Sequence, residues 1–286
     1  MKHFLTIFTF AALLVASCKP APEFKLDENI GICGVPGRVE AAKQHGLAYV
    51  EAGVASFLMP EKSDEEFAAN RAFAASCVPP IRTANGFYPK DVIFVGPDAD
   101  IERAVKYAET AIRRAHEIGI EVLVLGSGRS RGIPEGFEKE KAVEQFVAVL
   151  KGMAPCAEKN GVKIVIEPLQ KQECNFVNTV REGAAIARMV GSPNVGVLAD
   201  FFHMRREQED AGALTESADK LWHCHIAEVE ERTAPGVKGD DFTDYFKALK
   251  EIGYTGRISF ECGWKDIDIQ LPKAMEVMKT QIQSVK

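Results

Sequence analysis

Eight short apolar runs separated by helix-like stretches constrain the fold of this chain more than any other feature of its sequence. Each run is bounded and too short for a buried helix, which is typical of strands in a parallel sheet that is covered on both faces. The expected strands are 30–35, 49–54, 81–85, 122–126, 162–169, 195–200, 221–227 and 258–262.

Helical periodicity fills the segments between these runs. In 101–118 the apolar residues recur at helical spacing, and we expect Arg113 and Arg114 to face outward. Glycines are expected to end helices just before strands; they are Gly46, Gly119, Gly161 and Gly253. Further helices are expected at 141–160, 179–190, 242–252 and 271–284. The alternation predicts an α/β protein with a single domain at 29–286, a closed (β/α)₈ barrel or TIM barrel.

The first residues have the pattern of an export signal. A short basic start precedes residues 4–16, which are apolar apart from two threonines and too few to span a bilayer. The run closes with Val15-Ala16-Ser17-Cys18, which resembles the lipobox of bacterial lipoproteins. We therefore expect a signal peptide at 1–17, a lipid on Cys18, a proline-stiffened linker at 18–28 and a periplasmic, membrane-anchored product. An ordinary signal peptide with Cys18 incidental is the alternative.

Charge and cysteine content exclude some classes of protein. The formal net charge of −6 gives no reason to expect a nucleic-acid partner, which would favour a basic patch. The cysteines are scattered and lack the close spacings of a zinc ribbon or a small disulfide scaffold. Most are expected to be buried thiols, and a disulfide remains open because the chain is expected to be exported.

The ends of the last four expected strands carry groups that can bind a metal. Barrel enzymes have their active sites at the carboxyl ends of the strands. Glu167, Asp200 and Glu261 end three of these strands, and the fourth contains His223 and His225. Three converging carboxylates would repel one another without a cation. With one imidazole they predict a single divalent metal: Mn²⁺ first, with Mg²⁺, Co²⁺ or Zn²⁺ as alternatives.

Several motifs in order resemble those of the xylose isomerase-like barrels, which include sugar phosphate isomerases, hydroxypyruvate isomerases and ketose 3-epimerases. The similarity runs from about residue 30 to the C-terminus. Its motifs are Ile166-Glu167-Pro168-Leu169, Glu173-Cys174-Asn175-Phe176, Asp200-Phe201-Phe202-His203, His223-Cys224-His225-Ile226-Ala227-Glu228, Arg232-Thr233-Ala234-Pro235-Gly236 and Phe260-Glu261-Cys262.

The resemblance implies roles for seven residues. It assigns Glu167, Asp200, His225 and Glu261 to the metal, and Glu173, His203 and Arg232 to oxygens of the sugar. The segment between His225 and Arg232 is one residue longer than in the epimerases, so Glu231 or a water is the alternative to Arg232. His223 is expected to face the surrounding helices rather than the metal.

The resemblance also implies a mechanism. The cation acts as a Lewis acid on a hydroxy-ketone or hydroxy-aldehyde and stabilises an enediolate. Glu167 and Glu261 are the candidate catalytic residues. If one removes a proton and the other returns one on the opposite face, a carbon is inverted; if one carboxylate does both, an aldose and a ketose interconvert.

An exported enzyme does not meet cytoplasmic sugar phosphates, so a free sugar or a glycoside is the expected carbohydrate substrate. The alternative enzyme is a lyase or hydrolase of 3-keto-glycosides, and a third possibility is a non-catalytic sugar-binding lipoprotein. A DNA-repair endonuclease of the same fold needs further histidines on strands three and four, and the sequence has none there. A homo-oligomer is possible.

Two further features leave alternatives open. Gly126-Ser127-Gly128-Arg129 with Arg131 could hold an anion or form a plain turn. Glu51, at the end of the second expected strand, could face the pocket or brace neighbouring strand-end groups.

Overall fold

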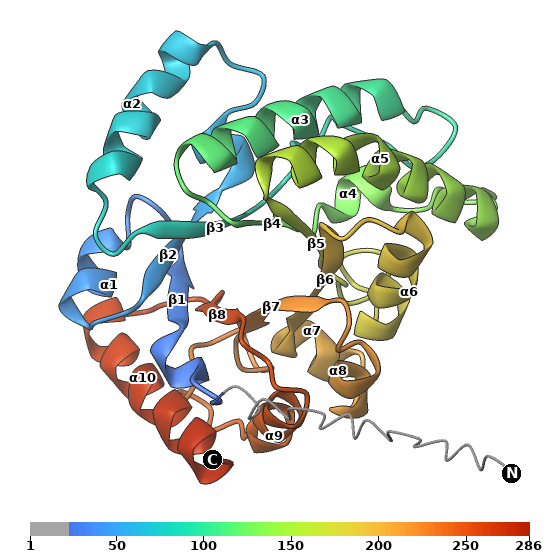
Figure 1. Ribbon diagram of the computed structural model, residues 1–286. Helices are drawn as coiled ribbons and strands as arrows, with labels where there is room; N and C mark the ends of the chain where they lie inside the picture. Colours follow the sequence, from blue (N-terminus) through green and yellow to red (C-terminus); the bar gives the residue numbers. More distant parts are fainter. Residues whose placement is uncertain (1–22) are drawn as a thin grey trace, which may run out of the picture.

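The structure, a computed structural model, describes residues 23–286 and contains a closed barrel of eight parallel strands that follow one another in chain order (Figure 1). This confirms the predicted single barrel. The strands are β1 (Ile30–Cys33), β2 (Tyr49–Gly53), β3 (Ile81–Asn85), β4 (Val122–Leu125), β5 (Lys163–Ile166), β6 (Val195–Asp200), β7 (Leu221–Ile226) and β8 (Arg257–Phe260).

Helices form the outer ring around these strands (Figure 1). The α-helices are α1 (Val39–Gln44), α2 (Asp64–Ser76), α3 (Ile101–Glu117), α4 (Gly128–Arg131), α5 (Lys139–Asn160), α6 (Val180–Val190), α7 (Phe201–Arg206), α8 (Gly212–Glu216), α9 (Thr243–Glu251) and α10 (Ile267–Ser284). A 3₁₀-helix, η1 (Leu26–Glu28), precedes β1, and a π-helical turn, η2 (Val54–Leu58), follows β2. The glycines expected to end helices have positive φ, for example 66° at Gly161 after α5.

The two faces of the sheet have different neighbours. Val124, Val165 and Leu198 form a small cluster inside the barrel, whereas residues between them on the same strands join the large core under the helices. Because side chains alternate along a strand, residues two positions beyond Val165 and Leu198 also point inward. Those residues are Glu167 and Asp200.

The folded body begins before the expected start of the barrel. Phe24 and Leu26 lie in the segment predicted as a linker, yet both are buried in the main core. The Nζ of Lys286 lies 2.8 Å from a carboxylate oxygen of Asp27 and ties η1 to the last residue of the chain. Residues 24–28 therefore belong to the folded body rather than to a linker. Cys18 and the predicted signal peptide at 1–17 lie outside the described residues.

Arg114 does not face solvent as expected. It is 3% exposed, and its guanidinium donates to the carbonyl oxygens of Leu58 and Lys62 and to the carboxylate of Asp64, with donor–acceptor distances of 2.8 Å each. It also donates to Met59 O and lies over the ring of Phe67. The expectation was wrong because η2 leaves carbonyl groups that need a donor next to α3.

We expect Arg114→Met to lower the free energy of unfolding by about 3 kcal/mol, because several buried carbonyls would lose their charged donor. Urea denaturation measures this loss. Arg113→Met is the matched control on the exposed side of α3, and it should change stability by less than about 0.5 kcal/mol. Equal effects of the two substitutions would contradict the structural role of Arg114.

Between Glu23 and Lys286, none of the helices combines the length and apolar character needed to cross a membrane. The six cysteines in this part of the chain are free thiols, as expected for most of them.

Candidate metal centre at the carboxyl ends of the strands

The four predicted ligands lie together at one end of the barrel. Glu167 follows β5, Asp200 ends β6, His225 lies in β7 and Glu261 follows β8. Each offers one ligand atom, and these atoms all lie within 4.8 Å of one another. Glu167, Asp200 and His225 are buried, and Glu261 is partly exposed at the mouth. The fold therefore brings together the four residues that the sequence indicated.

Two atoms of this group lack partners. Within residues 23–286, Oε1 of Glu167 and Nδ1 of His225 are buried and have no hydrogen bond. His225 Nδ1 lies 3.4 Å from that Glu167 oxygen and 3.2 Å from Oε2 of Glu261. Buried polar atoms are normally satisfied. Three carboxylates and one imidazole fit a hard divalent cation such as Mn²⁺, Mg²⁺, Co²⁺ or Zn²⁺, so these residues could hold one.

The local charges affect the carboxylates unequally. Burial, with the nearby charge of Glu261, raises the pKa of Glu167. Burial also acts to raise the pKa of Glu261, but His225 and Arg232 outweigh it and lower this pKa to about 2. For His225, burial favours the neutral ring, yet the surrounding acidic groups, Glu51 first, raise its pKa well above the ordinary value. The four candidate ligands together thus attract positive charge.

The two carboxylate oxygens of Asp200 have different partners. Its Oδ1 accepts a hydrogen bond from the backbone N–H of Phe202 at 2.9 Å and caps α7. Its Oδ2 points to the other candidate ligands and accepts a hydrogen bond from Arg232 at 2.9 Å. A helix cap and a ligand role are therefore compatible in this residue.

Arg232 reaches the site from the loop after β7. Its Nη2 contacts Asp200 and Glu261, and its guanidinium stacks over Phe202 at 4.7 Å from the ring centre. Glu231, the alternative weighed from the sequence, has a side chain that is 60% exposed and pairs with Lys238 at 3.3 Å. Of these two residues, Arg232 is the one at the mouth.

His203 and Glu173 complete the predicted set. His203 is buried, with Nε2 3.5 Å from Oδ2 of Asp200, and its Nδ1 accepts from the backbone N–H of Gln170 at 3.2 Å. Glu173 accepts from the side chain of Gln170 at 2.7 Å and lies 4.0 Å from Nη1 of Arg232. All three predicted substrate-binding residues therefore border the carboxylates.

Three nearby residues have roles that were not predicted from the sequence. Asn85, the last residue of β3, donates to Oε1 of Glu261 at 2.8 Å. Its position at the end of β3, on the inward face that it shares with Thr83, is the signal that indicates this role. Gly126 leaves space for Glu167, because a Cβ there would overlap Oε2 of that residue.

The third missed residue is Glu228, which anchors the loop that carries Arg232. Its fully buried carboxylate accepts from the hydroxyl of Thr233 at 2.8 Å. It also accepts from the backbone N–H groups of Gly236 at 2.8 Å, Lys238 at 2.6 Å and Gly239 at 2.9 Å. Burial acts to raise the pKa of Glu228, but these hydrogen bonds lower it below its ordinary value of 4.5.

We expect Glu228→Gln to lower the free energy of unfolding by about 1–3 kcal/mol, since an amide cannot accept from all these donors. Because the folded pKa is lowered, the stabilisation by Glu228 is present above about pH 4.5 and is lost as the pH falls through the folded pKa. Urea titrations across this range measure both effects. Glu230→Gln on the exposed side of the loop is the control; a flat difference between wild type and Glu228→Gln at all pH values would contradict this assignment.

His223 lies inside the barrel, below the candidate ligands, and the prediction for its orientation was wrong. His223 does not face the helices, because residues two apart on a strand share a face and His225 points inward. Nε2 of His223 lies 3.1 Å from Oε2 of Glu51, and Nε2 of His225 lies 3.0 Å from Oε1 of the same residue. Glu51 therefore faces the interior and braces strand-end groups.

Arg131 is not available to an anion. Its buried guanidinium donates to backbone carbonyls, at 2.7 Å to Glu167 O and 3.2 Å to both Leu125 O and Phe176 O. For Arg131, the structure favours the plain-turn interpretation. Arg129 is exposed and lines a recess beside the site.

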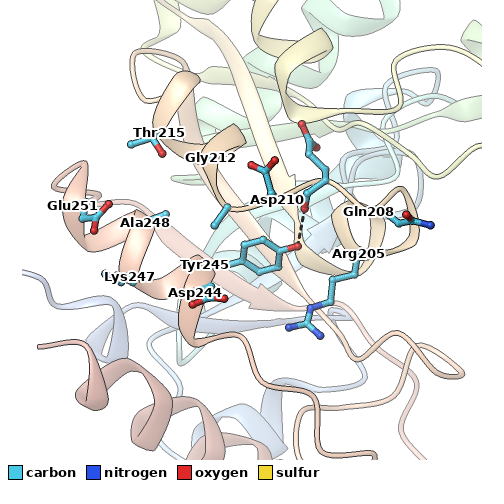
Figure 2. A pocket seen from close by; sticks show the side chains of 12 residues that line it. Arg205, Gln208, Asp210, Gly212, Thr215, Asp244, Tyr245, Lys247, Ala248 and Glu251 are labelled. Carbon is cyan, nitrogen blue, oxygen red and sulfur yellow. Dashed lines mark hydrogen bonds between the residues drawn. The ribbon is translucent and has the colours of Figure 1, made fainter.

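Three of the recesses on the protein surface bear on the location of a substrate site. One of about 530 Å³ opens beside Glu261 and Asn85, and one of about 330 Å³ opens beside Glu173. A third, of about 710 Å³, lies among α7, α8 and α9 in the outer ring, where Tyr245 donates to Glu209 O at 2.9 Å (Figure 2). The largest of the three therefore shares no lining residue with the candidate metal centre.

Comparison with known proteins gives a family and several relatives. Residues 39–282 match the family model described as xylose isomerase-like TIM barrel. An L-ribulose 3-epimerase from Methylomonas sp. (strain DH-1) is 32% identical over 46% of this chain and 53% of its own length. A putative hydroxypyruvate isomerase from Mus musculus is 27% identical over 80% of this chain and 83% of its own length. The match to the first of these spans only about half of the relative.

Solved structures share the fold. A D-psicose 3-epimerase with D-tagatose from Clostridium cellulolyticum H10 has a TM-score of 0.76 at 22% identity, covering 90% of this chain and 99% of its own. A 3-keto-D-glucoside 4-epimerase from E. coli has a TM-score of 0.75 at 20% identity, covering 88% and 99%. The IOLI protein, solved with a bound zinc atom, has a TM-score of 0.66 at 20% identity, covering 90% and 97%.

Proposed function

The chain belongs to the xylose isomerase-like TIM barrel family, and from this premise we propose that it is a metal-dependent sugar epimerase or isomerase that acts on a free sugar or a glycoside. The observation that carries the proposal is the convergence of Glu167, Asp200, His225 and Glu261 at the barrel mouth, with two buried atoms left unpartnered. The ketose 3-epimerases and the putative hydroxypyruvate isomerase among the relatives support the class of reaction.

The four residues would hold one divalent cation, Mn²⁺ first, which when bound supplies Lewis-acid polarisation of a carbonyl oxygen. Arg232, His203 and Glu173 would bind hydroxyl or carbonyl oxygens of the sugar from the same side of the mouth. Their contacts with Asp200 and with one another hold them in place before substrate binds, which reduces the entropic cost of orientation.

Glu167 and Glu261 would move the protons. They extend from β5 and β8, which are not neighbours in the barrel, so their carboxylates can approach one carbon of the substrate from different sides. Removal of a proton by one and return of a proton by the other inverts that carbon through an enediolate. Return by the same carboxylate to the neighbouring carbon interconverts aldose and ketose.

The test is solvent exchange. The Mn²⁺-loaded protein is incubated in D₂O with D-psicose, D-tagatose, D-fructose and L-ribulose in separate reactions, and carbon-bound deuterium and product configuration are read by NMR. Deuterium at the inverted carbon supports epimerisation, and deuterium at C1 of a ketose supports aldose–ketose isomerisation. Metal-loaded protein that exchanges no proton in any sugar and binds them unchanged would favour the non-catalytic sugar-binding protein.

A second candidate is a lyase or hydrolase of 3-keto-glycosides. It is favoured by the 330 Å³ recess beside Glu173, where Tyr88, Lys90 and Arg129 give room and polar groups for a substituent on the sugar. A 3-keto-D-glucoside 4-epimerase shares the fold. Release of the aglycone from a 3-keto-glycoside, without net inversion in free ketoses, would select this candidate.

We also propose that the chain is exported and anchored to a bacterial membrane through a lipid on Cys18. The pattern at residues 4–18 of the sequence supports this. Membrane fractionation of wild type and Cys18→Ala tests it, and an unchanged membrane fraction for the variant would contradict it.

A further inference from the structure

Glu51 lies at the centre of a buried polar network directly beneath the candidate metal ligands. It is fully buried in β2, and its two oxygens accept hydrogen bonds from side chains of three other strands. Oε2 accepts from Thr83 at 2.7 Å, from Ser259 at 2.6 Å and from His223 at 3.1 Å. Oε1 faces Nε2 of His225 at 3.0 Å.

This arrangement fixes where the hydrogen of His225 lies. An ionised carboxylate only accepts hydrogen bonds, so the ring nitrogen that faces Oε1 of Glu51 must carry a hydrogen. In the neutral ring the other nitrogen, Nδ1, then has a free lone pair. That nitrogen is the unpartnered atom that lies 3.2 Å from Glu261 and 3.4 Å from Glu167.

We propose that Glu51 is a positioning residue that holds His225 in the Nε2–H tautomer, so that Nδ1 is available to a divalent cation. The inference rests on the proposed metal dependence. A carboxylate that accepts from the second nitrogen of a metal-binding histidine orients the ring and increases its basicity. Thr83, Ser259 and His223 hold the Glu51 carboxylate in the one orientation that leaves Oε1 for His225.

A different reading makes Glu51 itself a ligand, because Cys33, Glu51 and His225 also bring potential ligand atoms within 4.8 Å of one another. Both oxygens of Glu51 are already used as acceptors within the barrel. Nε2 of His225 is the atom directed at this group, and it is occupied by its bond to Glu51. The geometry therefore favours a role for Glu51 in positioning His225 at the candidate metal centre over a role as a ligand of a second metal.

The test compares Mn²⁺ binding by the full chain and by Glu51→Gln. The amide keeps the volume of the side chain but has one acceptor oxygen in place of two, so it no longer enforces the Nε2–H tautomer. We expect the dissociation constant for Mn²⁺, measured by electron paramagnetic resonance, to rise by about 10–100-fold. Glu209→Gln is the matched control, because Glu209 is also buried and hydrogen-bonded but lies outside the candidate centre; its dissociation constant should stay within about threefold of wild type.

A second measurement separates positioning from general destabilisation. Ring ¹⁵N shifts, with His225 assigned from a His225→Gln spectrum, should show the Nε2–H form with Zn²⁺ on Nδ1 in wild type, and a changed pattern in Glu51→Gln. If Glu51→Gln does not fold, Glu51→Asp takes its place: it keeps the acceptor but shortens its reach, and it should keep the tautomer and bind Mn²⁺ more weakly than wild type. Equal Mn²⁺ binding by wild type and the Glu51 variants overturns the role of Glu51 alone, whereas no binding by wild type overturns the proposed metal dependence as well.

Discussion

Replacing either Glu167 or Glu261 with glutamine is expected to reduce turnover of the true substrate by about 10³-fold. Each substitution removes a group that would transfer a proton and also a negative charge that would bind the cation. The glutamine keeps the size of the side chain, so the barrel should remain folded. Steady-state kinetics at saturating Mn²⁺ separates the loss of the proton-transfer group from weaker metal binding.

The two variants also distinguish the reactions. If the enzyme inverts a carbon by a two-carboxylate route, each single variant should still exchange the proton that its remaining carboxylate handles, although net turnover is lost. If one carboxylate does both transfers, only one variant should lose exchange. Glu135→Gln, on an exposed loop, is the control and should behave as wild type. Full turnover in both Glu167→Gln and Glu261→Gln would refute the assigned roles.

Removing divalent metal should abolish activity and lower the thermal stability. At a free metal concentration 100 times the dissociation constant, binding to the folded chain alone stabilises it by about 2.7 kcal/mol. For a domain of this size we therefore expect chelation to lower the melting temperature by roughly 5–10 °C. Differential scanning calorimetry with and without chelator measures the shift, and metal analysis of the purified protein identifies the ion.

The loss of stability on chelation is expected because of the charge at the barrel mouth. Chelation would leave Glu167, Asp200 and Glu261 close together, with Arg232 and His225 as the nearby groups of opposite charge. In Asp200→Asn, the chelator should shift the melting temperature much less than in wild type, because a ligand is already lost. Activity that survives exhaustive chelation, with no metal in the protein, would contradict the proposed metal dependence.

Much of the fold was predictable because its signals are local. Eight apolar runs with intervening helices are read directly from the chain, and the observed strands agree with them to within a few residues. Once the strands are known, the carboxyl end of each one lies at the same mouth. Glu167, Asp200 and Glu261 can therefore be grouped from the sequence alone.

Other features depend on partners far along the chain. The burial of Arg114 arises from the carbonyls of a π-helical turn that starts 60 residues earlier, and no pattern within α3 indicates it. Asn85 matters through its bond to Glu261 on a strand that is remote in sequence. The orientation of His223, in contrast, is predictable from the sequence. Side chains two positions apart on a strand share a face, so His223 lies on the same face as His225 and the expectation that it faces the helices was wrong.

The early start of the folded body has a geometric consequence for an anchored form of the protein. η1 precedes β1, so the N-terminal segment enters the barrel at the end opposite the strand-end carboxylates. If Cys18 carries a lipid, as the sequence predicts, residues 18–23 span at most about 20 Å from the bilayer to Phe24. So short a connection would hold the amino ends of the strands near the lipid headgroups and turn the mouth with the strand-end carboxylates toward the surrounding fluid, where incoming sugars arrive.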